Sequence, residues 1–192
     1  MKIIEKKMPV IIESEVKIVL SKEELNAVKK MLPSVGFRFK NKEKISDYFI
    51  EIEKSKNGGW DFERIRCVDN KKYFLTLKKW ILDANKKKIR QESESVLAQK
   101  AALKKIANSQ LYYKKERTNY CGKYEKNKAV ISIDIMRKKS KKYRYLEVEV
   151  ISDKENSYKI RTGMKKWLLK TFNLKNREEA PSMLDIISKD FL

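Results

Sequence analysis

Charged side chains recur at every second position in two segments of the sequence. Glu13, Glu15 and Lys17 alternate with small or apolar residues, and Glu147 and Glu149 do the same near the other end. In a β-strand, alternate side chains point to the same face, so each row of charges shares one face. Carboxylate oxygens are the ligands that hard divalent cations prefer. The two acidic rows therefore indicate a metal site.

Other segments carry basic or mixed rows with the same spacing. These rows are Arg64 with Arg66, Thr76 with Lys78, Arg90 with Glu92 and Glu94, Lys115 with Arg117, and Ser132 with Asp134. Like charges side by side in a sheet destabilise it, and a bound cation would relieve the repulsion in the acidic rows. Basic rows would then hold an anionic partner. The plainer interpretation is that each row is the water-facing side of a sheet.

The overall charge favours anionic partners. Lys and Arg number 47 against 26 Asp and Glu, for a formal charge of +21, which attracts phosphates, nucleic acid or anionic membranes. A compositional bias toward lysine would explain the same excess. The sequence contains no histidine, so histidine metal ligands and histidine general bases are excluded. Any chemistry must use carboxylates, lysines, arginines and water.

The elements that position these rows are expected to be strands with a few helices. Ser21 and Glu24 form a capping-box pattern that predicts a helix to about Leu32, which Pro33 ends. Further helices are expected at about 93–107, at 159–172 and from about 182. Asn57-Gly58-Gly59 and Asp69-Asn70 predict hairpin turns. Many strands with interspersed helices predict an α+β fold with a largely antiparallel sheet.

Length and composition favour one cytoplasmic domain over residues 1–192. The hydrophobic fraction of 41% suffices for a core, and no linker divides the chain. No apolar run reaches the roughly 18 residues of a membrane span, so we expect no membrane partner. Two cysteines in a chain of this size favour reduced thiols and therefore the cytoplasm. We expect a monomer or a homodimer.

The order of the charged rows resembles that of a known family. Glu13-Ser14-Glu15-Val16-Lys17 is similar to the N-terminal ExExK strand of the CYTH proteins, also called triphosphate tunnel metalloenzymes. The other resemblances follow in the family's order from 11 to 187: Asp47-Tyr48-Phe49, Arg64-x-Arg66, Leu77-Lys78, Arg90-x-Glu92-x-Glu94, Lys115-x-Arg117, Asp134, Glu147-x-Glu149 and the segment 183–187. Ile18 departs from the family pattern, as do a missing glycine before Glu147 and the basic stretch 137–142.

The resemblance implies a closed eight-stranded antiparallel β-barrel with flanking helices. It implies that the tunnel binds a triphosphate with Mg²⁺ or Mn²⁺. The implied metal ligands are Glu13, Glu15, Glu147 and Glu149, with Glu92, Glu94 and Asp134 as additional acids. The implied phosphate-binding residues are Lys17, Arg64, Arg66, Lys78, Arg90, Lys115 and Arg117. The catalytic candidates are Glu13, Glu15 and Lys17, any of which could orient the attacking water.

Three functions follow as alternatives. The first is hydrolysis of tripolyphosphate, a nucleoside triphosphate or thiamine triphosphate. The second is an adenylyl cyclase that makes cyclic AMP from ATP. The third is an RNA-directed protein, either an RNA 5′-triphosphatase or an RNA binder, which the high positive charge favours.

Overall fold

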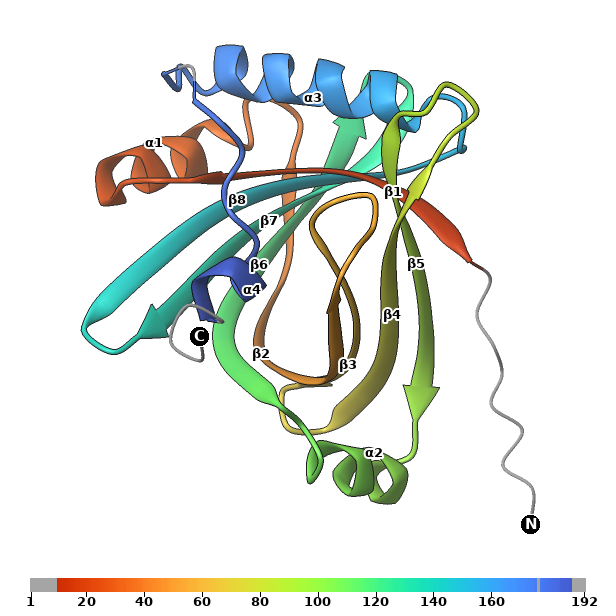
Figure 1. Cartoon of the computed structure of the whole chain (residues 1–192). Coiled ribbons are helices and arrows are strands. Elements are labelled where there is room, and N and C mark those ends of the chain that lie inside the picture. The colour runs from red at the N-terminus through yellow and green to blue at the C-terminus, as the bar shows by residue number, and fades with distance from the viewer. Residues whose placement is uncertain (1–9, 176, 188–192) are drawn as a thin grey trace. The chain divides into compact units, whose positions relative to one another are not determined.

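Eight β-strands and four helices make up the described part of the chain, residues 10–175 and 177–187 of a computed structural model (Figure 1). The strands are β1 (Ile11–Val19), β2 (Arg38–Lys54), β3 (Trp60–Val68), β4 (Lys72–Leu82), β5 (Lys88–Leu97), β6 (Leu111–Tyr124), β7 (Asn127–Lys138) and β8 (Lys141–Ser152). The helices are α1 (Lys22–Met31), α2 (Gln99–Ile106), α3 (Ser157–Thr171) and α4 (Met183–Ile187).

The strands form one sheet that closes on itself. Their order is β1-β5-β4-β3-β2-β6-β7-β8, and it forms a closed barrel. Neighbouring strands with an assigned register pair in antiparallel fashion. The expected α+β fold, a closed eight-stranded antiparallel barrel with flanking helices, is therefore confirmed.

Two compact units can be distinguished within the chain. Among the described residues, one unit consists of 10–12, 44–114 and 181–187, and the other of 13–43 and 115–180. Strands β2 and β6 each contribute residues to both units. The single domain expected over residues 1–192 stays a prediction.

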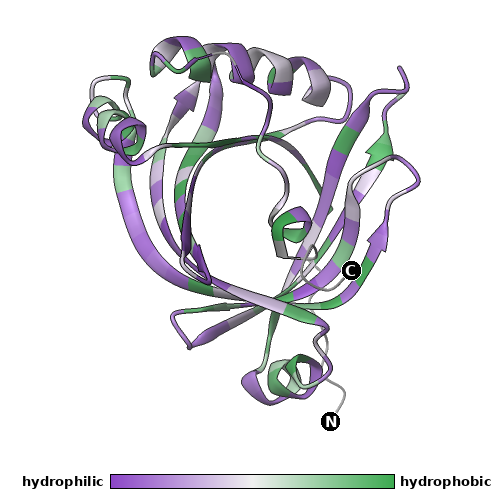
Figure 2. Cartoon of the chain, turned by 60° about the vertical axis from the view of Figure 1, so that its left-hand side comes forward, coloured by the Kyte–Doolittle hydropathy of each residue, from purple (hydrophilic) through white to green (hydrophobic). Residues whose placement is uncertain are grey.

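In the second unit, helices α1 and α3 cover the apolar face of the strands. Leu25 and Val28 of α1 and Met164 and Leu168 of α3 belong to one buried cluster with apolar residues of β1, β7 and β8. The strand members include Val16, Ile18, Ile131, Ile133, Leu146 and Val148. Because side chains alternate along a strand, the charged rows of β1, β7 and β8 lie on the opposite face from these helices. Figure 2 shows the alternation of hydrophilic and hydrophobic residues along the strands.

In the first unit, helix α2 has the same role. Ala102 of α2 is buried with Ile65, Cys67, Tyr73 and Leu97 of β3, β4 and β5. The residues that alternate with them carry the charged rows of these strands. The sequence pattern thus positions both sets of charges by burying the apolar residues between them.

Local sequence signals account for several element ends. Ser21 caps α1 by accepting a hydrogen bond from the Glu24 amide at 3.1 Å, and Glu24 returns one to the Ser21 amide at 2.8 Å, as the capping box predicts. Gly58 and Gly59 both have a φ near +84°, which a glycine adopts without strain. Asp69 and Asn70 form the β3–β4 turn with positive φ. Both predicted hairpin turns are confirmed.

One predicted helix begins later than the sequence indicates. Residues 93–97, expected as the first turn of a helix, belong to β5 and pair with β4, with Leu97 opposite Tyr73 and Ser93 opposite Leu77. Helix α2 begins at Gln99. The strand ladder supplies backbone hydrogen bonds that the local sequence cannot reveal. Among the described helices, none is long and apolar enough to cross a membrane.

Candidate active site

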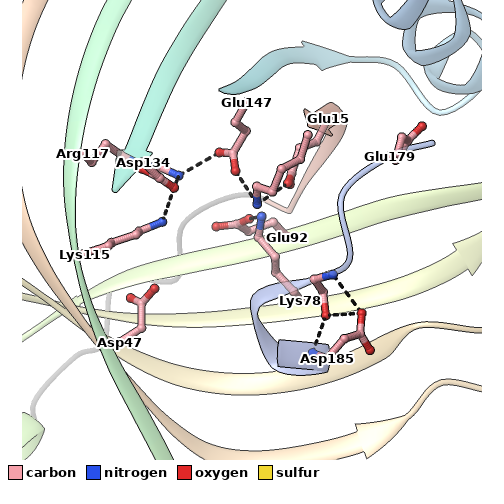
Figure 3. Close-up of polar contacts among 12 residues, drawn as sticks. Glu15, Asp47, Lys78, Glu92, Lys115, Arg117, Asp134, Glu147, Glu179 and Asp185 are labelled. Carbon is pink, nitrogen blue, oxygen red and sulfur yellow. Dashed lines mark hydrogen bonds and ion pairs between the residues drawn. The ribbon is translucent and has the colours of Figure 1, made fainter. Parts of the chain in front are cut away.

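A cluster of buried and partly buried ion pairs lies on the charged face of β1, β6, β7 and β8. We call it the first charge cluster, and it consists of Glu15, Lys17, Lys115, Arg117, Asp134 and Glu147. Asp134 is fully buried and accepts hydrogen bonds from Lys115 at 2.7 Å and from both Nε and Nη2 of Arg117 at 2.6 and 2.7 Å. The two nitrogens of the planar guanidinium match the two carboxylate oxygens, which fixes its orientation. Figure 3 shows Lys115 and Arg117 converging on Asp134.

Glu147 is held between two cations in the same cluster. Its Oε1 accepts from Nη2 of Arg117 at 2.9 Å, and its Oε2 lies 2.5 Å from Nζ of Lys17. Lys17 also donates to Oε1 of Glu15 at 3.0 Å. The repulsion that the sequence predicts between neighbouring acids is thus offset by two bases, Lys17 of β1 and Arg117 of β6.

The ion pairs determine the protonation states. Burial alone would lower the pKa of Lys17, but Glu147, Glu15 and Asp134 outweigh it and raise the pKa well above its ordinary value. Burial would raise the pKa of Glu147, but Arg117 and Lys17 outweigh it and hold the pKa far below its usual range. Lys17 is therefore a cation and Glu147 a carboxylate over the whole physiological pH range. A protonated Lys17 binds anions and is not a general base.

Two further acids predicted as metal ligands belong to the same unit. Glu13 is buried on β1, and Glu149 is half-buried on β8 and is close enough to Arg117 to raise its pKa together with Asp134 and Glu147. Their parity along the strands places them on the face of Lys17 and Glu147.

The charged face of β2 to β5, together with Tyr113 of β6, carries a second group. We call it the second charge cluster, and it consists of Asp47, Arg64, Arg66, Lys78, Arg90, Glu92 and Tyr113. Asp47 is fully buried and accepts from Nε and Nη2 of Arg66 at 2.8 and 3.0 Å, from Nη1 of Arg64 at 3.3 Å and from the Tyr113 hydroxyl at 2.8 Å. The sequence assigned no role to Asp47 or Tyr113. The signal for Asp47 was its place in the Asp47-Tyr48-Phe49 motif.

The remaining predicted residues of this unit pair across β4 and β5. Lys78 lies opposite Glu92 in the register, and its Nζ is 2.5 Å from Oε2 of that glutamate. Thr76 donates to Glu94 at 3.2 Å. Arg90 donates to the Trp60 carbonyl at 2.9 Å, and its guanidinium lies 5.2 and 4.8 Å from the ring centres of Phe62 and Trp80. These contacts hold the basic groups in fixed positions.

The donor set fits a divalent cation that shares its coordination with a substrate. Oxygens of Glu15 and Glu147 converge on one positive charge, the ammonium of Lys17. Among the described residues, no group of three or more acidic, cysteine or histidine side chains is arranged to hold a metal by itself. Mg²⁺ is commonly held by one or two carboxylates together with phosphate oxygens. Two converging carboxylates meet that requirement.

The hydrogen bonds that Asp47 accepts, here called the Asp47 network, provide a test of whether the second charge cluster stabilises the fold. Replacing Asp47 by asparagine is expected to lower the free energy of unfolding by about 3–5 kcal/mol, because it leaves the buried guanidinium of Arg64 without its countercharge. Urea denaturation measures the change. Glu51→Gln, an exposed change on the same strand, serves as the control. Equal stability of the Asp47 variant and the wild type would show that the network is not structural.

The first charge cluster predicts how stability depends on pH. Burial would raise the pKa of Asp134, but Arg117 and Lys115 outweigh it and lower the pKa to about 2. In the unfolded chain the pKa of an aspartate is about 3.9. A lowered pKa stabilises the fold above the unfolded value, and this stabilisation is lost as the pH falls through the folded value.

The free energy of unfolding should therefore fall between about pH 4 and pH 2, with about 2–3 kcal/mol of the loss due to Asp134. Urea denaturation at a series of pH values measures this dependence. Asp134→Asn should show a shallower fall over the same range. An unchanged acid dependence in that variant would refute the assignment.

Comparison with known proteins gives a family match over most of the chain. Residues 12–174 match the family model of the CYTH domain. No curated protein matches the sequence.

Solved structures share the fold at low sequence identity. A protein of Pyrococcus horikoshii OT3 has a TM-score of 0.64 and 18% identity, over 93% of this chain and 99% of that one. A candidate adenylate cyclase of Vibrio parahaemolyticus has a TM-score of 0.65 and 15% identity, over 93% and 98%. A candidate adenylyl cyclase of Hippeastrum, described as revealing a dominant triphosphatase activity, has a TM-score of 0.56 and 13% identity, over 94% and 96%.

Proposed function

The chain belongs to the CYTH domain family, and from that premise we propose that it is a divalent-cation-dependent triphosphatase. The proposed substrate is tripolyphosphate, a nucleoside triphosphate or thiamine triphosphate. The observation that carries the proposal is the first charge cluster, in which the partly buried cations Lys17 and Arg117 are both paired with Glu147. Such a cluster presents fixed positive groups to an anion and carboxylate oxygens to a metal.

The roles of the residues follow from their contacts. Arg117, whose guanidinium is oriented by Asp134, is proposed to bind the transferring phosphoryl group, and protonated Lys17 to bind a second phosphate oxygen. Mg²⁺ or Mn²⁺ held by Glu15 and Glu147, with Glu13 and Glu149 beside them, would neutralise charge on that group. Because Lys17 is protonated, we propose that a carboxylate, Glu13 or Glu15, accepts the proton of the attacking water.

The other predicted residues keep subsidiary roles. Asp134 is proposed to position Arg117 through two hydrogen bonds. Binding of a phosphate oxygen by Lys115 and the assignment of Asp134 as an additional acid stay part of the proposal. Binding of phosphate oxygens by Arg64, Arg66, Lys78 and Arg90 stays part of the proposal, as does the assignment of Glu92 and Glu94 as additional acids. Two free cysteines, Cys67 and Cys121, support a cytoplasmic location within the proposal.

Adenylyl cyclase activity is the second candidate. The fold match to the Vibrio parahaemolyticus protein, described as a candidate adenylate cyclase, favours it. The same cluster would then bind ATP while the ribose hydroxyl attacks the α-phosphate.

A substrate panel tests the proposal. Tripolyphosphate, ATP, thiamine triphosphate, 5′-triphosphorylated RNA and p-nitrophenyl phosphate are each incubated with the protein and Mg²⁺ or Mn²⁺. We expect kcat/KM for the best triphosphate to exceed that for the monoester by at least about 100-fold, because one monoester cannot engage several fixed cations. Phosphate release and cyclic AMP are measured in the same reactions.

Two outcomes of the substrate panel would contradict the triphosphatase proposal. Cyclic AMP as the main product from ATP would favour the cyclase. Faster cleavage of the monoester than of any triphosphate would overturn the triphosphatase assignment.

A further inference from the structure

The hairpin that joins β7 and β8 carries an unusual concentration of positive charge. Six of the eight residues from 137 to 144 are lysine or arginine, and none is acidic, whereas Lys and Arg are 47 of the 192 residues of the chain. The density of Lys and Arg in this segment is therefore about three times the average of the chain. We call residues 137–144 the basic hairpin.

The register places like charges directly opposite each other in the basic hairpin. Arg137 pairs with Lys142 and Lys138 pairs with Lys141 across the two strands. Arg137, Lys141 and Lys142 are exposed. Opposed like charges destabilise an antiparallel pair, so the hairpin retains an arrangement that a bound polyanion would stabilise.

One aromatic ring lies beside these charges on the same strand. Tyr143 is half-buried, and its ring is nearly parallel to that of Tyr145, with an interplanar angle of 12° and 6.5 Å between ring centres. Tyr145 is fully buried, so it fixes one side of the Tyr143 ring. A partly exposed and rigid aromatic ring next to basic side chains is the combination that binds single-stranded nucleic acid, because a base stacks on the ring while cations hold the phosphates.

We propose that the basic hairpin is a docking site for single-stranded RNA. Single strands are favoured over duplexes because the bases of a duplex are already stacked and leave Tyr143 nothing to bind. RNA is the proposed ligand because it is the abundant single-stranded polyanion of cells. Docking by the basic hairpin does not depend on the triphosphatase activity, since Lys141 and Lys142 lie outside the first charge cluster.

The test compares two charge reversals of equal size. In one variant Lys141 and Lys142 become glutamate. In the other, Lys126 and Lys128 become glutamate; they are exposed lysines in the β6–β7 turn and at the start of β7, at the opposite end of that strand. Binding to a labelled 20-nucleotide single-stranded RNA without a 5′-triphosphate is followed by fluorescence anisotropy. Several salt concentrations are used, and thermal melting confirms that both variants fold.

The basic-hairpin variant should bind the RNA at least about tenfold more weakly than the wild type and show a shallower salt dependence. Loss of two phosphate contacts reduces the slope by about 1.4 for a single strand. The Lys126/Lys128 variant should bind within about twofold of the wild type, since its lysines lie outside the site. Tyr143→Phe should retain binding, and Tyr143→Leu should lose about fivefold or more if a base stacks on the ring.

Equal weakening in both charge-reversal variants would overturn the proposal and assign RNA binding to overall charge. Unchanged binding by the basic-hairpin variant would overturn it too. So would binding of vesicles containing phosphatidylserine with none to RNA, or clear preference for duplex RNA or single-stranded DNA. Hydrolysis of tripolyphosphate should be the same in both variants, so failure of the docking site and failure of the triphosphatase assignment are separate results.

Discussion

Replacing Glu147 by glutamine is expected to lower kcat for triphosphate hydrolysis by at least about 100-fold. Glu147 is the proposed metal ligand that also pairs with both Lys17 and Arg117. Glutamine keeps the size of the side chain but removes its charge, so the site loses one oxygen ligand of the cation and the countercharge that positions two bases. Steady-state kinetics with saturating Mg²⁺ or Mn²⁺ measure the loss.

The Glu147→Gln substitution is also expected to change the melting temperature of the protein. From the sequence alone, glutamine would ease repulsion between Glu147 and Glu149. In the structure Glu147 neutralises two partly buried cations, so its replacement should lower the melting temperature. Glu125→Gln, an exposed change in the β6–β7 turn, is the control. Wild-type activity in a folded Glu147→Gln protein would show that Glu147 is not a metal ligand.

Replacing Arg117 by alanine is expected to lower kcat/KM by about 100- to 1000-fold. This range corresponds to about 2.7–4 kcal/mol of transition-state stabilisation, as for removal of other charge-stabilising donors. Arg117 is oriented by two hydrogen bonds to Asp134 and reaches Glu147 with the same guanidinium. Lysine keeps the charge but not the planar fork, so Arg117→Lys should recover only part of the activity.

Arg38→Ala provides the matched control, because Arg38 is an exposed arginine at the start of β2. It should leave kcat/KM within about twofold of the wild type. If Arg117→Ala retained full activity while remaining folded, the guanidinium would have no role in the transition state. Equal losses in both arginine variants would indicate a general effect of charge.

The alternation of charged and apolar residues predicted the fold because it is a local property. Charges at Glu13, Glu15 and Lys17 and apolar residues between them need two different faces, and the structure buries Val16 and Ile18 under helices. The hairpin turns were equally local, since glycine or asparagine at positive φ is required there.

The start of helix α2 could not be predicted because two patterns overlap in the sequence. Leu97 has helical spacing with Ala101, and Val96 with Leu103, while Glu92 and Glu94 have strand spacing. The ladder to β4 decides between them, and β4 lies more than ten residues earlier in the chain.

The ion pairs of the site depended on register, which the sequence does not reveal. The hydrogen bond between Lys115 and Asp134 across β6 and β7 could not be predicted from the motifs, and the assignments of Asp134 to a metal and of Lys115 to a phosphate stay predictions. Asp47 had no assigned role because its partners are 17, 19 and 66 residues away. Sequence motifs predicted which residues carry the charge, and the register determined which of them pair.

Phosphate release from tripolyphosphate, with Mg²⁺ or Mn²⁺ and then with excess EDTA, tests the proposed function most directly. The first charge cluster predicts rapid release with a divalent cation, and a loss of at least about 100-fold in EDTA that added cation reverses. Thermal melting in EDTA checks that the protein stays folded. Equal rates with and without EDTA, or no release from any triphosphate with either cation, would contradict the proposed function.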